Sequence, residues 1–273
     1  MGIDVDIVYK FFADYIYKHS GILYKPDDYY RLESRMQQMM QKLDLSTLDE
    51  LYLTYSKEVS LDLHRMIIDT ATNNETYFIR DKKPFDLLAK TLIPEIMKNN
   101  PPTIKIWSAA SSTGQEPYSI LMSIDNECGP SAFDKVSMNA TDISEAALEK
   151  ARSGKYTPLE VQRGLPITML MKYFEQNEDN SWTIDSRLKS KVNYSSFNLF
   201  DGAYPIMAYD IIFCRNVLIY QDMTNKELIL NKICDSMKED AYLFFGAGES
   251  LIGLNTPLEP KTINDVTVYV KKK

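Results

Sequence analysis

The chain has few of the residues that build most protein metal sites and catalytic triads. Its 273 residues include two histidines, His19 and His64, and three cysteines, Cys128, Cys214 and Cys234. Neither histidine has a partner at the spacing of metal ligands, so we expect neither a histidine-based metal site nor a Ser-His-Asp triad. The cysteines also lack metal-ligand spacing, and we expect them to be reduced thiols in the core.

The chain also lacks a long apolar run and an excess of positive charge. No run reaches the roughly 18 residues that a membrane-spanning helix needs, and the first residues, MGIDVDIVYKFF, do not form a secretory signal. The formal net charge is −7 and the isoelectric point is about 5.1. This charge argues against sequence-independent binding to nucleic acid. We therefore expect a cytoplasmic protein that neither binds nucleic acid nor inserts directly into a membrane.

Residues 1–75 have helical periodicity, and we predict that they form an N-terminal helical domain. Ser46 and Asp49 have the spacing of a capping box, which predicts a helix over residues 48–56. In the preceding helix, which we expect over residues 26–43, one stripe is apolar and its neighbour is polar and mainly basic. The apolar stripe contains Leu32, Met36, Met39, Met40 and Leu43, and the polar stripe contains Arg31, Arg35, Gln38 and Lys42.

From about residue 103 onward, strand-like and helical segments alternate. This pattern predicts an α/β domain with a mostly parallel sheet covered by helices on both faces. We expect strands at residues 104–107, 136–140, 192–197, 210–214, 241–245 and 266–270. Ser144 and Gly154 should begin and end a helix between the second and third of these strands.

Two segments do not follow the alternation of strands and helices. Residues 157–191 contain chain-breaking residues and a turn-rich stretch at 177–180, which predict a helix and a β-hairpin inserted in the sheet domain. Residues 76–102 lie between the helical region and the first strand. We therefore divide the chain into an N-terminal domain, a linker over 76–102, and a domain over 103–273 that carries the insertion.

The loop at residues 108–114 connects the first strand to a helix, as a nucleotide-binding loop does. Its side chains are small, but it has a single glycine, Gly114, where a phosphate-binding loop would have two or three. Glu116 at the helix start would repel a phosphate and attract an ammonium or sulfonium group. Asp142, after the second strand, can accept hydrogen bonds from the two hydroxyls of a ribose. Together these residues indicate S-adenosylmethionine, although the loop alone could be an ordinary strand-to-helix turn.

Four segments in the same order resemble the chemotaxis receptor methyltransferases of the CheR type. They are NETYFIR at 74–80, WSAASSTGQEPYS at 107–119, TDISEAALEKARSGKY at 141–156 and NLFDGAYPIMAYDIIFCRNVLIY at 198–220. The similarity covers most of the chain from about residue 70 to 250. It implies a Rossmann-like S-adenosylmethionine-dependent methyltransferase sheet, with an N-terminal helical domain and a small inserted β-subdomain.

The resemblance implies functions for particular residues. Arg80 and Tyr220 are the implied catalytic residues, with Arg80 orienting the acceptor carboxylate and Tyr220 beside the methyl group. The implied cofactor contacts are Asn74, Thr76, Arg80, Glu116, Asp142, Asn198, Leu199, Arg215 and Asn216. Part of the segment 76–102 would therefore contact the cofactor.

This sequence departs from the family pattern at three positions near those motifs. Ile79 replaces the second Phe of N-x-T-x-F-F-R, and Gln115 replaces the first Glu of G-E-E-P-Y-S. Gln221 stands where an aromatic residue often follows the tyrosine of R-N-V-x-I-Y. None of the three removes an implied contact, but Ile79 changes the packing beside Arg80.

The implied reaction moves a methyl group from S-adenosylmethionine to glutamate carboxylates of chemoreceptors and releases S-adenosylhomocysteine. The implied partner is the helical cytoplasmic domain of a receptor, contacted through Arg31, Arg35 and Lys42, with the inserted hairpin as a second candidate contact. The hairpin loop is short and lacks glycine, so we expect an enzyme that does not depend on a receptor tail. Two alternatives keep the cofactor: a methyltransferase for small carboxylic acids, and a non-catalytic regulator that binds S-adenosylmethionine. A nicotinamide-dependent oxidoreductase would need the G-x-G-x-x-G turn that this chain lacks.

Overall fold

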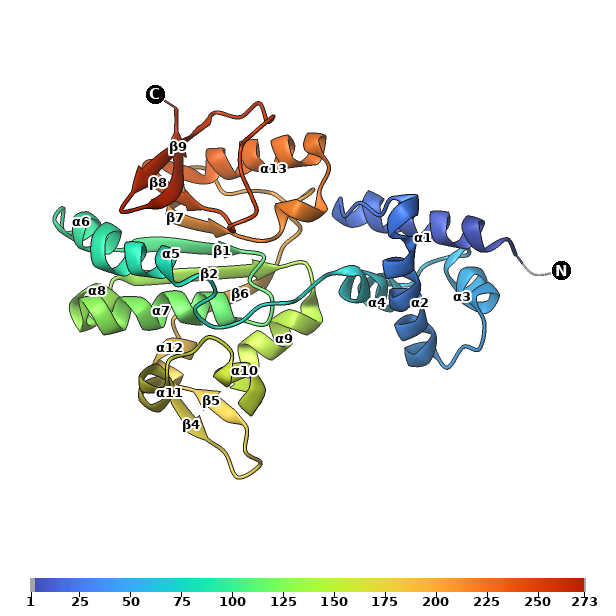
Figure 1. Ribbon diagram of the computed structural model, residues 1–273, viewed down its shortest axis with the longest axis horizontal. Helices are drawn as coiled ribbons and strands as arrows, with labels where there is room; N and C mark the ends of the chain where they lie inside the picture. Colours follow the sequence, from blue (N-terminus) through green and yellow to red (C-terminus); the bar gives the residue numbers. More distant parts are fainter. Residues whose placement is uncertain (1–2, 273) are drawn as a thin grey trace.

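The computed structural model describes residues 3–272, and its N-terminal part is a bundle of helices with a core of its own (Figure 1). The bundle contains α1 (Val5–Ser20), the 3₁₀ turn η1 (Pro26–Asp28), α2 (Tyr29–Leu43), α3 (Leu48–Tyr55) and α4 (Leu61–Ala71). As predicted from the apolar stripe of α2, Leu32, Met36 and Met39 are buried in this core.

The predicted capping box of α3 is wrong by one residue. Thr47, not Ser46, caps the helix: its hydroxyl accepts a hydrogen bond from the Glu50 amide at 3.2 Å, and the Glu50 carboxylate accepts one from the Thr47 amide at 3.3 Å. Both pairs have the same sequence spacing, so spacing alone does not distinguish them. Asp49 instead accepts hydrogen bonds from the amide of Ile3, across the bundle.

The described part of the chain after α4 is built around a seven-stranded sheet. The strand order is β6 (Val192–Ser196), β2 (Val136–Asp142), β1 (Ile104–Ala109), β7 (Tyr209–Cys214), β8 (Met237–Phe244), β10 (Val266–Lys271) and β9 (Leu258–Ile263). The first five are parallel, and β10 runs antiparallel to both of its neighbours. The mostly parallel sheet is therefore confirmed. The edge strand β9 was not predicted, because its sequence, LEPKTI, contains proline and charged residues and has a weak strand pattern.

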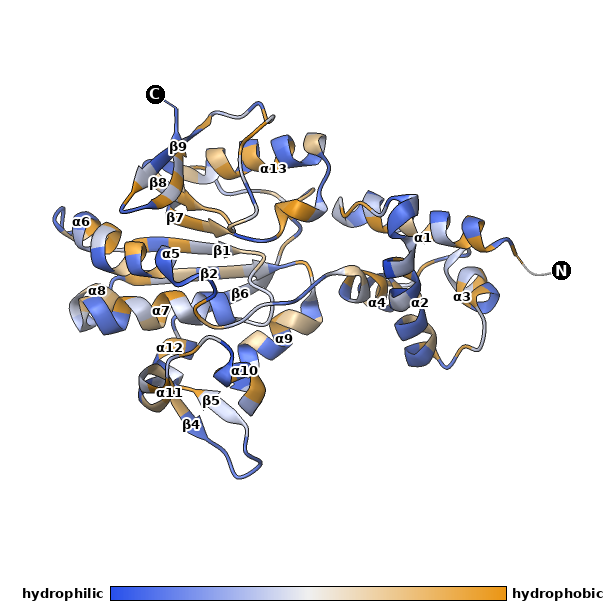
Figure 2. Cartoon of the chain, in the orientation of Figure 1, coloured by the Kyte–Doolittle hydropathy of each residue, from blue (hydrophilic) through white to orange (hydrophobic). Residues whose placement is uncertain are grey.

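Successive residues of the central strands face two different apolar layers. Ile106 of β1 and Phe213 of β7 belong to one layer, whereas Trp107 and Ile212 belong to the other. The first layer is covered by α5 (Lys82–Leu87), η2 (Leu88–Leu92), α6 (Ile93–Met97) and α7 (Gln115–Cys128), and the second by α13 (Met223–Ser236). Figure 2 shows apolar and polar residues side by side on α7 and α13, as expected for helices that cover a sheet. The segment assigned as a linker is thus largely helical and packs on the sheet.

The insertion contains a second, three-stranded sheet. Its strand order is β3 (Lys155–Tyr156), β5 (Trp182–Ile184) and β4 (Phe174–Gln176), flanked by α10 (Pro158–Gln162), α11 (Ile167–Tyr173) and α12 (Ser186–Lys189). The predicted helix and hairpin are confirmed, whereas the two-residue strand β3 was not predicted. As expected, Ser144 caps α9 (Glu145–Ser153), and Gly154, with a φ of 64°, ends it.

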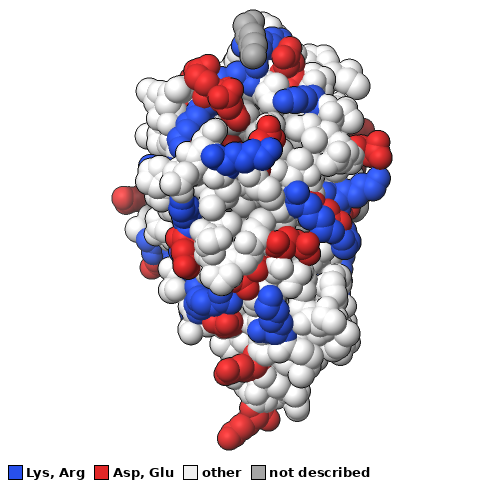
Figure 3. All heavy atoms as spheres, turned by 90° about the vertical axis from the view of Figure 1, so that its left-hand side faces the viewer, with Lys and Arg blue, Asp and Glu red and all other residues white. Residues whose placement is uncertain are grey.

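On the end of the molecule farthest from the N-terminal helices, basic and acidic side chains are interspersed (Figure 3). Within residues 3–272, none of the helices has both the length and the apolar character needed to cross a membrane.

Candidate active site

A cleft lies where the carboxyl ends of β1, β2 and β7 meet, at the point where the strand order changes direction. Open parallel sheets bind their ligands at this position. The cleft holds about 920 Å³ of empty space, counted out to its open mouth.

One wall of the cleft comes from the N-terminal bundle. Ser20, the last residue of α1, and Ile22, two residues further on, line the cleft. Ile22 forms an antiparallel bridge with Gln221, and the amide of Leu23 donates to the carbonyl of Tyr220 at 3.0 Å. Gln221, at the position where the family pattern often has an aromatic residue, donates from its Nε2 to the carbonyl of Ser20 at 3.2 Å. No local pattern in the sequence predicts this wall.

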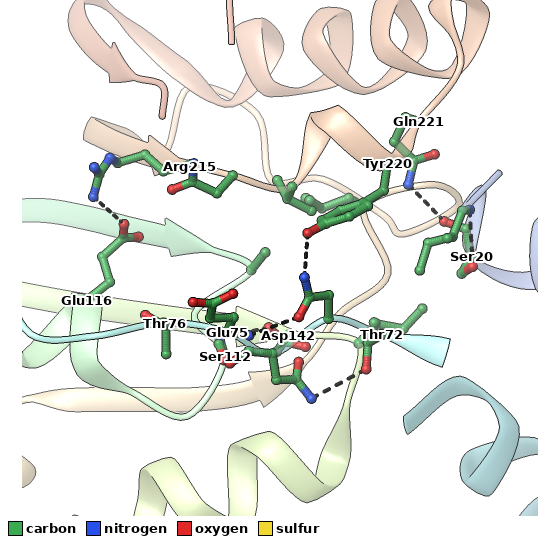
Figure 4. A pocket seen from close by; sticks show the side chains of 18 of the residues that line it. Ser20, Thr72, Glu75, Thr76, Ser112, Glu116, Asp142, Arg215, Tyr220 and Gln221 are labelled. Atoms are coloured by element: carbon green, nitrogen blue, oxygen red, sulfur yellow. Dashed lines mark hydrogen bonds and ion pairs between the residues drawn. The ribbon is translucent and has the colours of Figure 1, made fainter. Parts of the chain in front are cut away.

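All ten residues predicted from the sequence line this cleft. They are Asn74, Thr76, Arg80, Glu116, Asp142, Asn198, Leu199, Arg215, Asn216 and Tyr220. Figure 4 labels Thr76, Glu116, Asp142, Arg215 and Tyr220 among them. The cleft is also lined by residues that we did not select, including Ser20, Ile22, Asn73, Glu75, Ser112 and Ile143.

The loop between β1 and α7 is held in place by Asp142. The Asp142 carboxylate accepts hydrogen bonds from the amides of Ser112, at 2.8 Å, and Ser144, at 2.9 Å. Burial raises the pKa of Asp142, and these two amide hydrogen bonds oppose the rise. Each carboxylate oxygen retains acceptor capacity, so Asp142 can shape the loop and still accept from ligand hydroxyls.

The geometry explains why a single glycine is sufficient in this loop. Gly114 has a φ of 94°, and a Cβ at this position would lie 2.9 Å from the side chains of Ala151, Tyr156 and Tyr194. Glycine is therefore needed where the loop packs on its neighbours. Ala110 and Ser112, which line the cleft, adopt positive φ angles of 67° and 51° without being glycine.

Arg215 lies between two carboxylates at one end of the cleft. Its buried guanidinium is 2.8 Å from the Asp81 carboxylate and 3.2 Å from that of Glu116. Burial raises the pKa of Glu116, whereas the Arg215 guanidinium and the Ser108 hydroxyl, at 2.8 Å, oppose the rise. When both carboxylates are ionised, this trio carries one negative charge in excess, which suits a cationic ligand.

Arg80 and Tyr220 approach the cleft from different parts of the chain. Within residues 3–272, Arg80 forms no ion pair; its Nη1 donates to the Glu75 carbonyl at 3.3 Å, and its guanidinium lies 5.5 Å from the Tyr77 ring centre. Asp81, the residue next to Arg80, pairs with Arg215 and not with Arg80. The Arg80 guanidinium therefore remains able to bind an incoming carboxylate.

The backbone around Arg80 is set by its neighbours. Ile79, one of the departures from the family pattern, is buried with a φ of 53°, and Asp81 has a φ of 57°. The amide of Ile79 donates to the Ser119 hydroxyl at 2.9 Å. A β-branched residue at positive φ is uncommon and strained, so this turn is held by its surroundings rather than by its own preference.

Asn198 connects the sheet domain to the N-terminal bundle. Its Nδ2 donates to the His19 carbonyl at the end of α1, at 2.7 Å, and its Oδ1 accepts from the Phe200 amide at 3.0 Å. Leu199, Phe197 and Ile143 also line the cleft and add apolar surface to it, as is usual in small-molecule sites.

The sheet order, with its antiparallel β10, and the polar cleft at the change of strand direction define a Rossmann-like methyltransferase. The family profile described as CheR methyltransferase, SAM binding domain, matches residues 74–266. The chain belongs to the CheR methyltransferase family.

Curated relatives agree with this assignment along the whole chain. The chain is 38% identical over 248 residues to the chemotaxis protein methyltransferase Cher2 of Pseudomonas putida, covering 89% of this chain and 90% of that protein. It is 38% identical over 269 residues to the chemotaxis protein methyltransferase of Vibrio parahaemolyticus, covering 98% of each chain. The Escherichia coli chemotaxis protein methyltransferase is 30% identical over 273 residues, covering 98% of this chain and 92% of that one.

The cofactor is S-adenosylmethionine, and the cleft has the chemistry to hold it. Asp142 offers acceptors for ribose hydroxyls, and the wall near Leu199 is apolar. When Asp81 and Glu116 are both ionised, the excess negative charge around Arg215 suits the sulfonium and ammonium groups of the molecule.

Proposed function

We propose that this cleft transfers the methyl group of S-adenosylmethionine to glutamate side chains of chemoreceptors, forming methyl esters. The observation that carries the proposal is the Arg80 guanidinium, which lines the cleft with Tyr220 and has no carboxylate partner in the described chain. The bound cofactor supplies an electrophilic methyl group on a sulfonium. A glutamate carboxylate oxygen forms the new bond to that methyl group, and S-adenosylhomocysteine is released.

The acceptor needs no general base. A glutamate side chain has a reference pKa of about 4.3 and is already ionised at neutral pH. The protein therefore has to position the carboxylate and exclude water, and good positioning can remove up to about 7–11 kcal/mol of a barrier. Arg80 orients the carboxylate through its paired N–H groups, and Tyr220 places its hydroxyl beside the reacting atoms. We assign cofactor binding to Asn74, Thr76, Arg80, Glu116, Asp142, Asn198, Leu199, Arg215 and Asn216.

The basic stripe of α2, defined by Arg31, Arg35 and Lys42, is our candidate surface for the receptor. Arg31 lies 5.9 Å from the ring centre of Tyr24. Burial raises the pKa of Tyr24. The positive charges of Arg35 and Arg31 oppose this rise, whereas Tyr220 adds to it. The basic stripe thus begins close to the catalytic tyrosine, where an acidic receptor helix could reach both.

The test uses methyl-labelled S-adenosylmethionine, the purified protein and a chemoreceptor cytoplasmic fragment. We expect label in the receptor as an alkali-labile ester that is released as methanol and disappears when the acceptor glutamates are replaced by alanine. Label on a small carboxylic acid without receptor would instead support the small-acid enzyme. Cofactor binding without any transfer would support the regulatory alternative.

The inserted sheet is the second candidate receptor contact. Its β4–β5 turn is tight, with the Asn177 amide donating to the Ser181 carbonyl at 2.8 Å. We propose that methylation does not require a receptor tail. Receptor fragments with and without their last residues should therefore give the same kcat/KM, and a large loss on removing the tail would contradict this.

A further inference from the structure

Glu249 lies in the loop after β8, outside the residues assigned to the cleft. Its carboxylate accepts hydrogen bonds from four backbone amides. One oxygen accepts from the amides of Val217, at 3.0 Å, and Leu218, at 2.8 Å. The other accepts from the amides of Asn216, at 2.7 Å, and Gly246, at 2.9 Å. Three of these four amides belong to the segment that follows β7.

That segment carries cleft residues and leads directly to the catalytic tyrosine. Asn216 and Val217 line the cleft, and the 3₁₀ turn η3 (Leu218–Tyr220) places Tyr220 at its end. Asn216 has a φ of 59°, a conformation that needs support from outside the segment. A carboxylate that accepts from consecutive amides can provide this support, because it binds them all in one orientation.

The loop that carries Glu249 also contacts residues 216–218 through Gly246. A Cβ at position 246 would lie 2.4 Å from the Nδ2 of Asn216, so Gly246 allows the two loops to approach closely. The amide of Glu249 donates to the Gly246 carbonyl at 3.0 Å, which closes a tight turn around the carboxylate. The exits of β7 and β8 are thereby joined at one side chain.

We propose that Glu249 is a positioning residue for methyl transfer: its carboxylate fixes the backbone at 216–218 and so places Asn216 and Tyr220 in the cleft. Glu249 itself does not line the cleft that holds the cofactor. The inference rests on the proposed role of Tyr220 at the acceptor.

The first test is Glu249→Gln, which keeps the size of the side chain. The amide has one acceptor oxygen, and its NH₂ group would face amides that also donate. We expect kcat to fall about 100-fold, the scale of a misplacement of about 1 Å at a reacting group. The rate is expressed per site titrated with S-adenosylhomocysteine, so that loss of folded protein does not count. Glu249→Asp keeps the negative charge on a side chain that is shorter by one methylene. Its kcat should lie between those of the wild type and Glu249→Gln.

The matched control is Glu239→Gln, because Glu239 lies on β8 with an exposed side chain and should leave kcat unchanged. If Glu249 acts through Tyr220, the double variant Glu249→Gln/Tyr220→Phe should be little worse than Glu249→Gln alone. A wild-type kcat per titrated site in Glu249→Gln, with only a lower melting temperature, would overturn the inference. An unchanged kcat in Tyr220→Phe would instead overturn the proposed acceptor site, whatever Glu249 does.

Discussion

The side-chain amide of Asn73 donates a hydrogen bond to the hydroxyl of Tyr220 at 2.7 Å, although the two residues are 147 positions apart. This contact joins the segment that carries Arg80 to the end of the last cleft motif. Because Asn73 uses the hydroxyl as an acceptor, the Tyr220 proton remains available to donate toward an acceptor carboxylate.

Replacing Tyr220 with Phe should therefore lower turnover without unfolding the protein. The loss should be about 10- to 100-fold in kcat, since a hydrogen bond to a charged group contributes about 1.5–3 kcal/mol. S-adenosylhomocysteine affinity, measured by calorimetry, should change much less. Asn73→Ala should reproduce part of the loss, and a full wild-type rate in both variants would exclude this role for the contact.

Arg80→Ala should impair turnover more than cofactor binding. Arg80 makes no ion pair in the described chain, so its removal leaves no buried carboxylate without a partner. We expect kcat/KM for the receptor to fall about 10- to 100-fold, the value of a charge-assisted hydrogen bond. Arg80→Lys should retain only part of the wild-type kcat/KM, because lysine lacks the planar, two-pronged guanidinium of arginine. Equal losses of turnover and of cofactor affinity would contradict an orienting role.

Reversing the basic stripe of α2 should weaken receptor methylation alone. In Arg31→Glu/Arg35→Glu we expect a higher KM for the receptor and a weaker dependence of the rate on salt, with unchanged S-adenosylhomocysteine affinity. Lys98→Glu/Lys261→Glu is the matched control, because it makes the same charge change at the C-terminal end of α6 and on β9, in the part of the sheet domain away from the N-terminal helices (Figure 1). If both double variants behave alike, net charge and not the stripe determines the effect.

The attachment of the insertion to the sheet domain should depend on pH. The Asp125 carboxylate of α7 pairs with Arg187 of α12 at 2.7 Å and accepts from the Tyr173 hydroxyl at 2.8 Å. Burial tends to raise the pKa of Asp125, but Arg187 and Tyr173 outweigh it and hold the pKa below its usual value. The stabilisation is therefore present above the unfolded-state pKa of about 3.9 and is lost as the pH falls through the lower, folded-state value.

Asp125→Asn measures this contribution. At pH 7 the variant should unfold about 1–3 kcal/mol more easily than the wild type, in denaturant titrations. The difference should shrink as the pH is lowered from about 5 toward 2, because the wild type then loses the same charge. A difference that stays constant over this range would show that the ion pair does not stabilise the fold.

The sequence was most informative where local chemistry determines the structure. Ser144 begins and Gly154 ends α9 as predicted. An N-cap side chain and a left-handed glycine each determine a helix end through contacts within one turn of that helix. The capping box was predicted one residue too early, because Ser46–Asp49 and Thr47–Glu50 have the same sequence spacing. The strand β9 was missed because its pairing with β10, and not its own composition, holds it in the sheet.

The cleft could be predicted only in part for a similar reason. The ten residues predicted from the four motifs all line the cleft. Each motif lies at the carboxyl end of a strand or in the segment that crosses those ends. Ser20, Ile22 and Asn73 lie outside the strands, and tertiary pairing with Tyr220 and Gln221 brings them to the cleft. No periodicity or spacing in one sequence records such pairing.

The bridge between Ile22 and Gln221 has a consequence for how members of this family can be recombined. The residues matched by the family profile begin at 74, whereas Ser20 and Ile22 complete the cleft wall that also contains Tyr220. A chimera that borrows the first helices of a relative in order to change its receptor would also exchange part of the cofactor's enclosure. Under the proposed docking of the receptor on α2, such a chimera would change receptor choice and the cleft wall together, and a graft meant to leave the cleft unchanged has to keep Ser20 and Ile22 of the recipient.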